Sequence, residues 1–286
     1  MQGTKSGAMP LRKDLTTIFF RRFSLFKSGQ QADMEEALEC ILYRLHEETV
    51  DKDTGSSIVD SARVRRKEVH KCQICGREAV KEQDCYVLHL NIPTASAPKG
   101  SWKLRELVKH SLQSRTDTDS PCNWCKTKIL EKHIKDTKEE RRWVYARYQF
   151  PEGKRQTTIS TIVSMPDELC LSIGRFNSVS RDGTVYGKNH ATVKSPVMLH
   201  LAKSFGDNAS GKARLATFAS HHGNSLVQGH WTLSKSLGLG NFVVFSDGTV
   251  KRPTKAEVAK QGSTATVLLY LTEGCERDEA GPEHVR

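Results

Sequence analysis

The stretch VQGHWTLSKSLGLGNFVVFSDGTV, residues 227–250, is the part of this chain that best indicates its fold and chemistry. In it His230 follows a glycine and precedes an aromatic residue, and the tetrapeptide Phe-Ser-Asp-Gly comes about sixteen residues later. Apolar runs separated by glycines predict two β-strands of one sheet. Such strands can hold a general base, His230, beside a polar side chain that orients its ring. A base of this kind needs a nucleophile, which the rest of the sequence has to supply.

The composition indicates a globular chain with a sizeable core. Its 286 residues are enough for one large domain or two small ones. The formal net charge of +11 is compatible with nucleic acid or an acidic protein surface as a partner. However, the 44 basic residues are mostly interspersed with 33 acidic ones, which is more typical of a solvated surface than of a binding stripe.

The sequence has no feature of a membrane or secreted protein. No apolar run approaches the roughly 18–20 residues that span a bilayer, and the start lacks the apolar region of a signal peptide. Four of the eight cysteines form two Cys-x-x-Cys pairs, which fits a reducing compartment. We therefore expect an intracellular protein of the cytoplasm or the nucleus, without membrane contact.

The elements change in kind along the chain. Residues 33–48 predict a helix with Asp33 as its amino-terminal cap and Glu36 reaching back, and an apolar face formed by Met34, Leu38, Ile41 and Leu45. Residues 85–92 predict a strand and residues 101–112 a second amphipathic helix, whereas the charged residues 126–142 predict a solvated hairpin or helix edge. Strands are then expected in the runs 143–150, 157–165, 168–176, 213–220, 241–250 and 264–271.

Two cysteine pairs predict a structural zinc site. Cys72 and Cys75 form the first Cys-x-x-Cys knuckle, and Cys122 and Cys125 form the second. Four thiolates make a closed tetrahedral site with no open position, so the metal would be structural and not catalytic. Four unrelated thiols or disulfides are the alternative.

Three histidines lie close together in the sequence, at His221, His222 and His230. A metal bound by all three is an alternative to the role of His230 as a base. Neighbouring residues of a strand point to opposite faces, so His221 and His222 are expected to point apart. The spacing therefore disfavours a second metal site.

Around His230 the sequence resembles the carboxyl-terminal part of the ubiquitin-specific proteases, papain-like cysteine peptidases built from a thumb, fingers and a palm. Gly229-His230-Trp231 resembles the family's Gly-His-aromatic box, with tryptophan where tyrosine is usual. His222, eight residues earlier, matches another histidine of the family. The segment 245–250 is similar to the family's aromatic residue, Asp or Asn, Asp and following Val, and the apolar run 266–270 is similar to its closing strand.

Earlier motifs extend the resemblance in the family's order. The segment 165–176 is similar to its Leu-Pro…Leu-x-Leu-x-x-Arg-Phe strand, and the cysteine pairs match its zinc-binding fingers. The segment 31–47 is similar to its Gln-Gln-Asp-x-x-Glu-x-Leu helix. Residues 21–23, Arg-Arg-Phe, and 37–40, Ala-Leu-Glu-Cys, resemble a divergent branch that often looks inactive. Together these motifs cover roughly residues 20–272.

The resemblance implies an α+β, papain-like fold. Its parts would be a truncated helical thumb (1–60), zinc-stapled fingers (61–164), an antiparallel palm (165–272) and a polar tail (273–286), all within one peptidase domain. The parent reaction hydrolyses the bond after the carboxyl-terminal glycine of ubiquitin, with ubiquitin cupped by fingers and palm. His230 would be the general base and Ser246 its orienter, with Asp247 as an alternative orienter. The residues expected to contact ubiquitin are His222, Trp231, Asp33 and Glu36.

The nucleophile of the family is missing from the sequence. It belongs to an Asn-x-x-Cys-Tyr box several tens of residues before the Gln-Gln-Asp helix, whereas only about thirty residues, without cysteine, precede that helix here. The remaining cysteines are expected in the first helix, in strands and beyond the last strand, where they do not serve as nucleophiles: Cys40, Cys85, Cys170 and Cys275. The family's oxyanion donor belongs to the same box.

The orienting residue is also altered. Ser246 can accept a hydrogen bond from an imidazole N–H, but it carries no charge and so holds the ring more weakly than a carboxylate. Asp247 is expected to point to the other side of the strand.

Two accounts fit the missing cysteine. The chain is either a fragment of an active enzyme or a short, inactive ubiquitin-binding pseudo-peptidase, and in both cases we expect no hydrolysis by the chain as given. A third hypothesis, from another class, is a basic zinc protein that binds nucleic acid.

Overall fold

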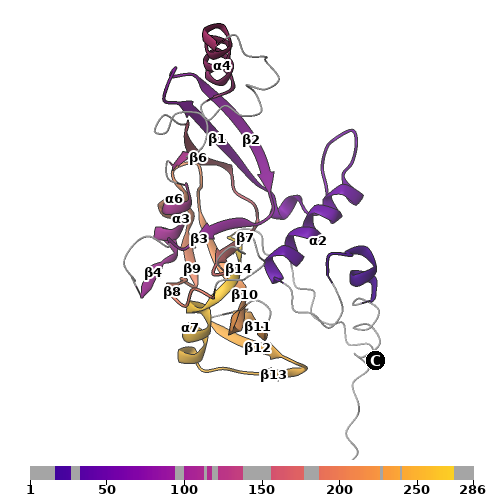
Figure 1. The fold of residues 1–286 in the computed structure, drawn as a ribbon. Helices are drawn as coiled ribbons and strands as arrows, with labels where there is room; N and C mark the ends of the chain where they lie inside the picture. The colour runs from indigo at the N-terminus through magenta and orange to yellow at the C-terminus, as the bar shows by residue number, and fades with distance from the viewer. Residues whose placement is uncertain are drawn as a thin grey trace, which may run out of the picture.

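The computed structural model describes residues 17–26, 33–93, 100–112, 115–117, 122–137, 156–176, 187–225, 228–238 and 240–273. Two sheets dominate this part of the chain, and Figure 1 shows the smaller one extending away from the larger one toward helix α4. The mixture of helices with mostly antiparallel sheets agrees with the predicted α+β fold. None of the described helices is long and apolar enough to cross a membrane.

The larger sheet has eight strands, seven of them in the order β13-β12-β11-β10-β14-β7-β3, while β9 pairs with β10. Only the pairing of β3 with β7 is parallel. In sequence order the strands are β3 (Leu88–Asn91), β7 (Glu168–Gly174), β9 (Met198–His200), β10 (Lys212–Ser225), β11 (Gln228–Gly238), β12 (Asn241–Ser246), β13 (Thr249–Lys251) and β14 (Ala265–Thr272).

The smaller sheet has the order β2-β1-β6-β5, and β4 and β8 form a separate parallel pair. The strands are β1 (Val64–Cys72), β2 (Glu78–Cys85), β4 (Ser101–Lys103), β5 (Arg115–Asp117), β6 (Gln156–Ser164) and β8 (Thr192–Lys194). Residues 17–22 are helical, and the labelled helices are α2 (Met34–Thr49), η1 (Asp60–Ala62), α3 (Leu104–Leu112), α4 (Asn123–Thr137), α6 (Leu201–Phe205) and α7 (Lys255–Ser263). Residues 61–164 thus supply the small sheet and also β3 of the large one, and the division into thumb, fingers and palm stays a prediction.

Most predicted strands and both amphipathic helices are present. The run 85–92 is a correction, because β2 ends at Cys85 and β3 begins only at Leu88. The charged run 126–142 is helical as far as Thr137, where α4 buries Cys125 and Leu130. The predicted strand 143–150 and the polar tail beyond Glu273 lie outside the described residues.

Opposite charges set the register of β1 against β2. Arg65 lies opposite Asp84, Lys67 opposite Glu82, Glu68 opposite Lys81, and Lys71 opposite Glu78. Two of these pairs are in direct contact, Arg65 with Asp84 at 3.1 Å and Lys71 with Glu78 at 3.2 Å. A shift by one residue would remove every one of these pairings, since side chains alternate between the faces of a sheet.

Helix α2 packs on the large sheet through both apolar and polar contacts. Met34, Leu38 and Leu42 lie against a buried cluster that includes Cys170 and Val267. The apolar face therefore includes Leu42, a residue that the predicted face did not contain.

His89 of β3 ties α2 to the sheet. Its Nδ1 lies 2.5 Å from Glu35 and its Nε2 lies 2.8 Å from Glu39. The hydrogen bond to Glu35, followed by further contributions from both carboxylates, raises the pKa of His89 to about 9. Glu35 also accepts a hydrogen bond from the Ser172 hydroxyl, so the beginning of α2 is fixed to both β3 and β7.

A buried arginine joins several elements of the larger sheet. Arg175 follows β7, is 1% exposed, and donates hydrogen bonds to four backbone carbonyls. Burial lowers the pKa of Arg175 to about 10, which leaves the guanidinium charged at neutral pH. The acceptors and their distances are Ala265 (2.8 Å), Asn189 (3.2 Å), Ala191 (2.6 Å) and Ser263 (2.9 Å).

The substitution Arg175→Lys is expected to lower the free energy of unfolding by about 2–4 kcal/mol. An ammonium group cannot reach four carbonyls spread around a planar guanidinium, and each buried group left unpaired costs about 1–3 kcal/mol. Urea unfolding followed by circular dichroism measures the change. The matched control is Arg105→Lys on the exposed side of α3, where a change below about 0.5 kcal/mol is expected. Equal stabilities of the two variants would contradict this role of Arg175.

Candidate active site and metal centre

The antiparallel pairing of β10 with β11 determines which residue lies opposite each of the three histidines. His222 lies opposite His230, and their rings are 6.3 Å apart and nearly parallel. His221 lies opposite Trp231, with ring centroids 4.8 Å apart. The prediction that His221 and His222 point to opposite faces is confirmed.

His230 has a partner on each ring nitrogen. Its Nε2 lies 2.7 Å from Ser246 Oγ, and its Nδ1 lies 3.2 Å from Asp247 Oδ2. The expectation that Asp247 points away from the ring is wrong. Asp247 is not part of a strand: it follows β12 with a φ of +43°, and this left-handed backbone turns its carboxylate back toward the imidazole.

The two partners constrain which tautomer His230 adopts. A carboxylate can only accept, so the contact with Asp247 favours a hydrogen on Nδ1. Nε2 then accepts the hydroxyl hydrogen of Ser246. To take a proton from a nucleophile at Nδ1, the imidazole has to release Asp247 and carry its own hydrogen on Nε2, where the Ser246 hydroxyl oxygen accepts it. The Asp247 side chain is 83% exposed, so water screens its contact, and Asp247 is the partner more easily released.

Gly229 precedes His230 for a steric reason. A β-carbon at this position would lie 2.3 Å from the ring of His221 and 2.6 Å from the carbonyl oxygen of His222. Real β-carbons do not come so close to other atoms, so any side chain here would push β10 and β11 apart. The packing of His221 thus explains the glycine of the Gly-His-aromatic box.

His221 is part of the packed interior. It is 1% exposed, and its two ring nitrogens have no hydrogen-bond partner among the residues that the structure describes. Burial, aided by the positive charge of Lys188, lowers the pKa of His221 to about 4, so the ring is neutral at physiological pH. His222 has a separate contact, 2.9 Å from Nε2 to the Thr232 hydroxyl. The three histidines do not converge on one metal, and within the described ranges only the cysteines form a cluster that could bind one.

The residues expected to contact ubiquitin lie beside this site or on α2. Trp231 and Met34 line a pocket of about 240 Å³ together with residues 245–250, which include both partners of His230. Asp33 is used as the cap of α2, where its carboxylate accepts from the Glu35 N–H at 2.9 Å. Glu36 is exposed on the first turn. Sequence reasoning missed Met34 as a pocket residue, because the helical pattern alone placed it in the core.

The described cysteines outside the cluster are not activated thiols. Burial raises the pKa of Cys40 and of Cys85, and it raises the pKa of Cys170 to about 12. A nucleophilic cysteine needs the opposite shift, toward the thiolate. Cys275 lies outside the described residues.

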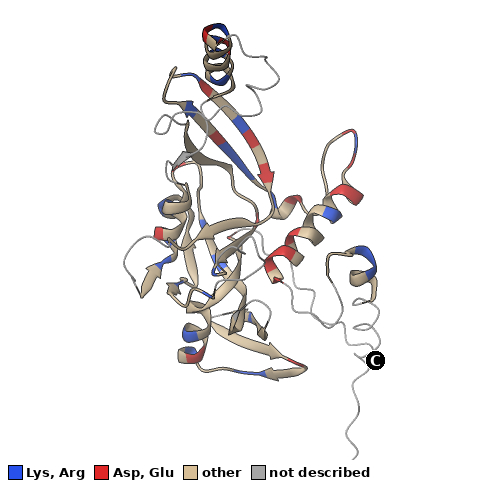
Figure 2. Ribbon diagram, in the orientation of Figure 1, with Lys and Arg blue, Asp and Glu red and all other residues tan. Residues whose placement is uncertain are grey.

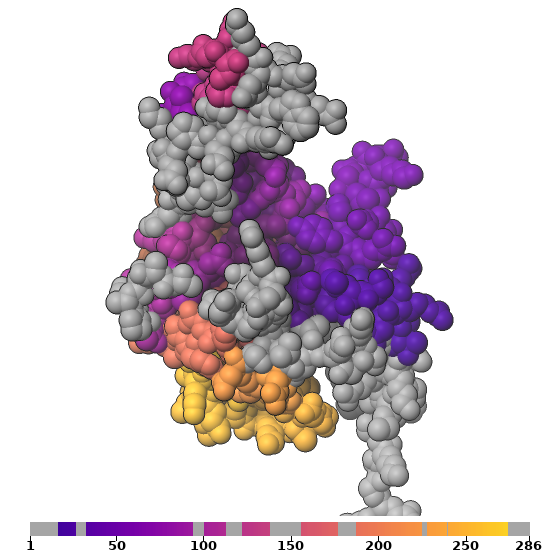
Figure 3. Space-filling view, in the orientation of Figure 1, coloured from indigo at the N-terminus to yellow at the C-terminus, as the bar shows by residue number. Residues whose placement is uncertain are grey.

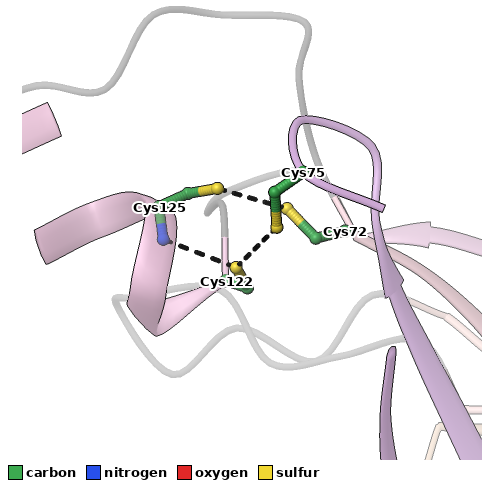
Figure 4. Close-up of side chains that lie close together, drawn as sticks. All are labelled: Cys72, Cys75, Cys122 and Cys125. Carbon is green, nitrogen blue, oxygen red and sulfur yellow. Dashed lines mark hydrogen bonds between the residues drawn. The ribbon is translucent and has the colours of Figure 1, made fainter. Parts of the chain in front are cut away.

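The four remaining cysteines meet at the far end of the small sheet (Figure 4). All four sulfurs lie within 4.8 Å of one another, with Cys72 and Cys125 3.8 Å apart and Cys75 and Cys122 3.6 Å apart. A zinc tetrahedron with metal–sulfur bonds of about 2.3 Å places its sulfurs about 3.8 Å apart. A disulfide needs a separation of about 2.05 Å, so the disulfide alternative is wrong for these four. The residues therefore fit a structural zinc ion, which Cys72, Cys75, Cys122 and Cys125 would hold.

The two knuckles differ in build. The first is a turn after β1, where Gly76 has a φ of +70° and its N–H donates to Cys72 O at 2.9 Å. The second opens helix α4, where the Cys125 N–H lies 3.5 Å from Cys122 Sγ. Arg77 of the first knuckle stacks 4.2 Å from the ring of Trp124 in the second, a contact that the spacing of the cysteines did not predict.

The comparisons with known proteins identify the family. The model of the ubiquitin carboxyl-terminal hydrolase family matches residues 4–270, nearly the whole chain. The chain therefore belongs to the ubiquitin carboxyl-terminal hydrolase family. A search of curated proteins finds no match.

Solved structures share the fold. The SAGA DUB module Ubp8/Sgf11/Sus1/Sgf73 bound to monoubiquitin matches with a TM-score of 0.66 and 17% identity, over 91% of this chain and 53% of the matched one. The module bound to ubiquitin aldehyde matches with a TM-score of 0.64 and 17% identity, over 90% and 53%. A yeast module with a variant Sgf73 matches with a TM-score of 0.63 and 17% identity, over 84% and 50%. The chain thus spans about half the length of the chains it matches.

The substitution Gly229→Ala is expected to destabilise the chain by about 1–3 kcal/mol or more, because the added methyl group overpacks the His221 ring. Thermal unfolding measures the loss. Gly100→Ala is the matched control, since a β-carbon there meets no atom within 4 Å. A Gly229→Ala variant as stable as the control would contradict the steric role.

The double substitution Cys75→Ser and Cys122→Ser is expected to abolish zinc binding, from one zinc ion per chain to none, as measured by atomic absorption. Stability should fall as well, by about 4 kcal/mol under conditions where free zinc exceeds its dissociation constant a thousandfold. Cys40→Ser, outside the cluster, should retain the metal. Undiminished zinc content in the double variant would refute the assignment.

Proposed function

We propose that this chain is the ubiquitin-recognising part of a thiol-dependent ubiquitin hydrolase, which presents a catalytic base but no nucleophile of its own. The observation that carries the proposal is the 2.7 Å contact between His230 Nε2 and Ser246 Oγ, on neighbouring strands of the large sheet. It is the arrangement of a base and its orienter that acyl transfer requires. Family membership supports ubiquitin conjugates as the substrate class.

The small sheet offers a surface on which ubiquitin can lie. Val80, Val69 and Ile159 are direct neighbours across β2, β1 and β6 and so share one face of the sheet. Val80 is 58% exposed and Ile159 is 45% exposed. Together with Val69 they form an exposed apolar row, which is typical of a protein-binding surface. Two of the matched structures contain ubiquitin or ubiquitin aldehyde, which supports the same ligand here.

The catalytic roles follow from the geometry of the site. His230 would act as general base, Ser246 would orient its ring, and Asp247 would hold the other nitrogen until a nucleophile takes its place. The described cysteines outside the four-cysteine cluster all have a raised pKa, whereas a nucleophilic thiol needs a lowered one. We therefore propose binding without turnover for the 286 residues alone. A fragment whose nucleophile comes from another segment is the alternative.

The proposed location is the cytoplasm or the nucleus. Four unbridged thiols that lie this close together remain available to zinc only where disulfide formation is suppressed.

Ubiquitin titration of the 286-residue chain by calorimetry should show saturable binding, because the apolar row remains accessible. Val80→Asp should weaken the binding at least tenfold, and Ile58→Asp, on an apolar residue outside this sheet that is also exposed (68%), should not. Ubiquitin with an electrophilic carboxyl terminus should leave the chain unlabelled.

Two results would count against the proposal. Covalent labelling that disappears on substitution of one cysteine would show a nucleophile in the chain. Salt-sensitive binding to RNA or DNA without any binding of ubiquitin would favour the nucleic-acid hypothesis instead.

A further inference from the structure

A second pocket lies on the large sheet, between the sheet, helix α7 and strand β8. Its volume is about 380 Å³, within the range of about 300–1,000 Å³ that is usual for small-ligand sites. Leu215, Phe218, Phe242 and Val258 supply apolar walls, and the rings of Phe218 and Phe242 lie 5.6 Å apart. Lys194 and Lys255 also line it, one from β8 and one from α7.

This pocket and the His230 site lie at different places along the same face of the sheet. Residues an even number of positions apart on a strand share a face, so Phe242 lies on the face of Ser246, and Phe218 lies on the face of His222, which pairs with His230. The second pocket has no lining residue in common with the pocket formed by residues 245–250. A ligand in the second pocket would therefore leave His230 and its two partners uncovered.

Hydrogen bonds hold the walls of the second pocket in place. The buried Tyr270 donates its hydroxyl hydrogen to Pro196 O at 2.8 Å, and the Leu215 N–H donates to Val197 O at 2.8 Å. The start of α7 is fixed by a capping box between Thr254 and Glu257. The pocket is thus formed before any ligand arrives, so ordering it costs no additional entropy on binding.

The charge around the pocket is positive. Neither Lys194 nor Lys255 makes an ion pair with another residue that the structure describes, and the pocket lining contains no carboxylate. Residues 187–273 carry ten Lys and Arg against four Asp and Glu, whereas α2 carries five Glu and one Arg. Figure 2 shows the blue segments of α7 and β13 far from the red segments of α2, and Figure 3 shows the yellow α7 region beside the salmon-coloured residues near 200 on the surface.

We propose that this pocket binds an acidic peptide segment of a partner protein. One large apolar side chain of the peptide inserts between Phe218, Phe242 and Val258, and flanking carboxylates pair with Lys194 and Lys255. An apolar pocket that is open on one side, with two cations at its rim, suits a single anchoring side chain with acidic neighbours. A flat anionic membrane has no such anchor to insert, which makes it the less suitable ligand.

The test uses fluorescein-labelled heptapeptides with the sequence Glu-Asp-Glu-X-Glu-Asp-Glu, where X is Trp, Phe, Leu, Met or Gly. Fluorescence anisotropy with the 286-residue chain should show binding for at least one apolar X and at least tenfold weaker binding for Gly. The charge reversal Lys194→Glu with Lys255→Glu should weaken binding roughly tenfold or more, because two attractive exposed pairs become repulsive. Glutamate in the first turn of α7 suits the helix dipole, so this variant should remain folded.

Matched controls separate the pocket from net charge. Lys132→Glu with Lys135→Glu makes the same charge change on exposed residues of α4 and should alter the affinity less than twofold. Ala259→Glu, on an exposed residue of the pocket rim, should weaken binding like the first double variant. Amide chemical-shift changes on binding should be confined to α7, β8, β10 and β12.

Three outcomes would overturn the proposal: equal affinity for the Gly peptide, no binding of any apolar peptide at millimolar concentration, or equal weakening by the α4 control. Vesicles with 30% phosphatidylserine provide a further arm. Vesicle binding that is lost in the Lys194/Lys255 variant, without peptide binding, would assign the surface to an anionic membrane instead.

Discussion

The large sheet depends on the four hydrogen bonds that the Arg175 guanidinium donates to backbone carbonyls. The guanidinium joins the end of β7 to the last residue of α7, the first residue of β14 and the segment before β8. β14 lies between β7 and β10, so its position determines where β10, β11 and β12 lie. A buried cation whose partners are carbonyl dipoles has no compact substitute, because only a planar group with five donors can reach them all. The His230 site and the second pocket both lie on strands whose position depends on this one side chain.

The small sheet is held together in a different way. Its outer strand β2 is exposed along most of its length and has little apolar surface to bury. Charge pairing along β1 and β2 and the four-cysteine cluster at their far end replace a core there. The large sheet is stabilised by a buried core, whereas the small sheet relies on charge pairs and a metal-binding cluster. A small sheet that projects from a domain cannot bury enough apolar surface to be stable by that means alone. Charges on an edge strand also discourage pairing with other chains.

The residues of the candidate sites were easier to predict from the sequence than the strands and helices that have few apolar residues. The cysteine pairs and the His230–Ser246 pair could be predicted because their residue types and spacings are tied to specific chemistry. The hairpin of β1 and β2 could not be predicted, because its strands consist mostly of charged and polar residues and lack the apolar alternation that indicates a strand. Helix α7 was missed although Thr254 and Glu257 carry its capping signature, since its apolar face is small. The position of Asp247 depends on a two-residue hairpin loop in which Asp247 and Gly248 both have positive φ; the Asp-Gly pair indicates such a turn, but the predicted strand 241–250 ran through it.

The close packing of Gly229 against His221 has a consequence for how such sequences are compared. A lineage that abandons hydrolysis still needs the glycine, because the sheet does not close around any larger residue. Purifying selection on folding therefore preserves part of the Gly-His-aromatic signature after selection on turnover has ended. The glycine of the motif is required by packing against His221 and not by the reaction. An intact Gly-His-aromatic motif in a relative is therefore not by itself evidence of catalytic activity.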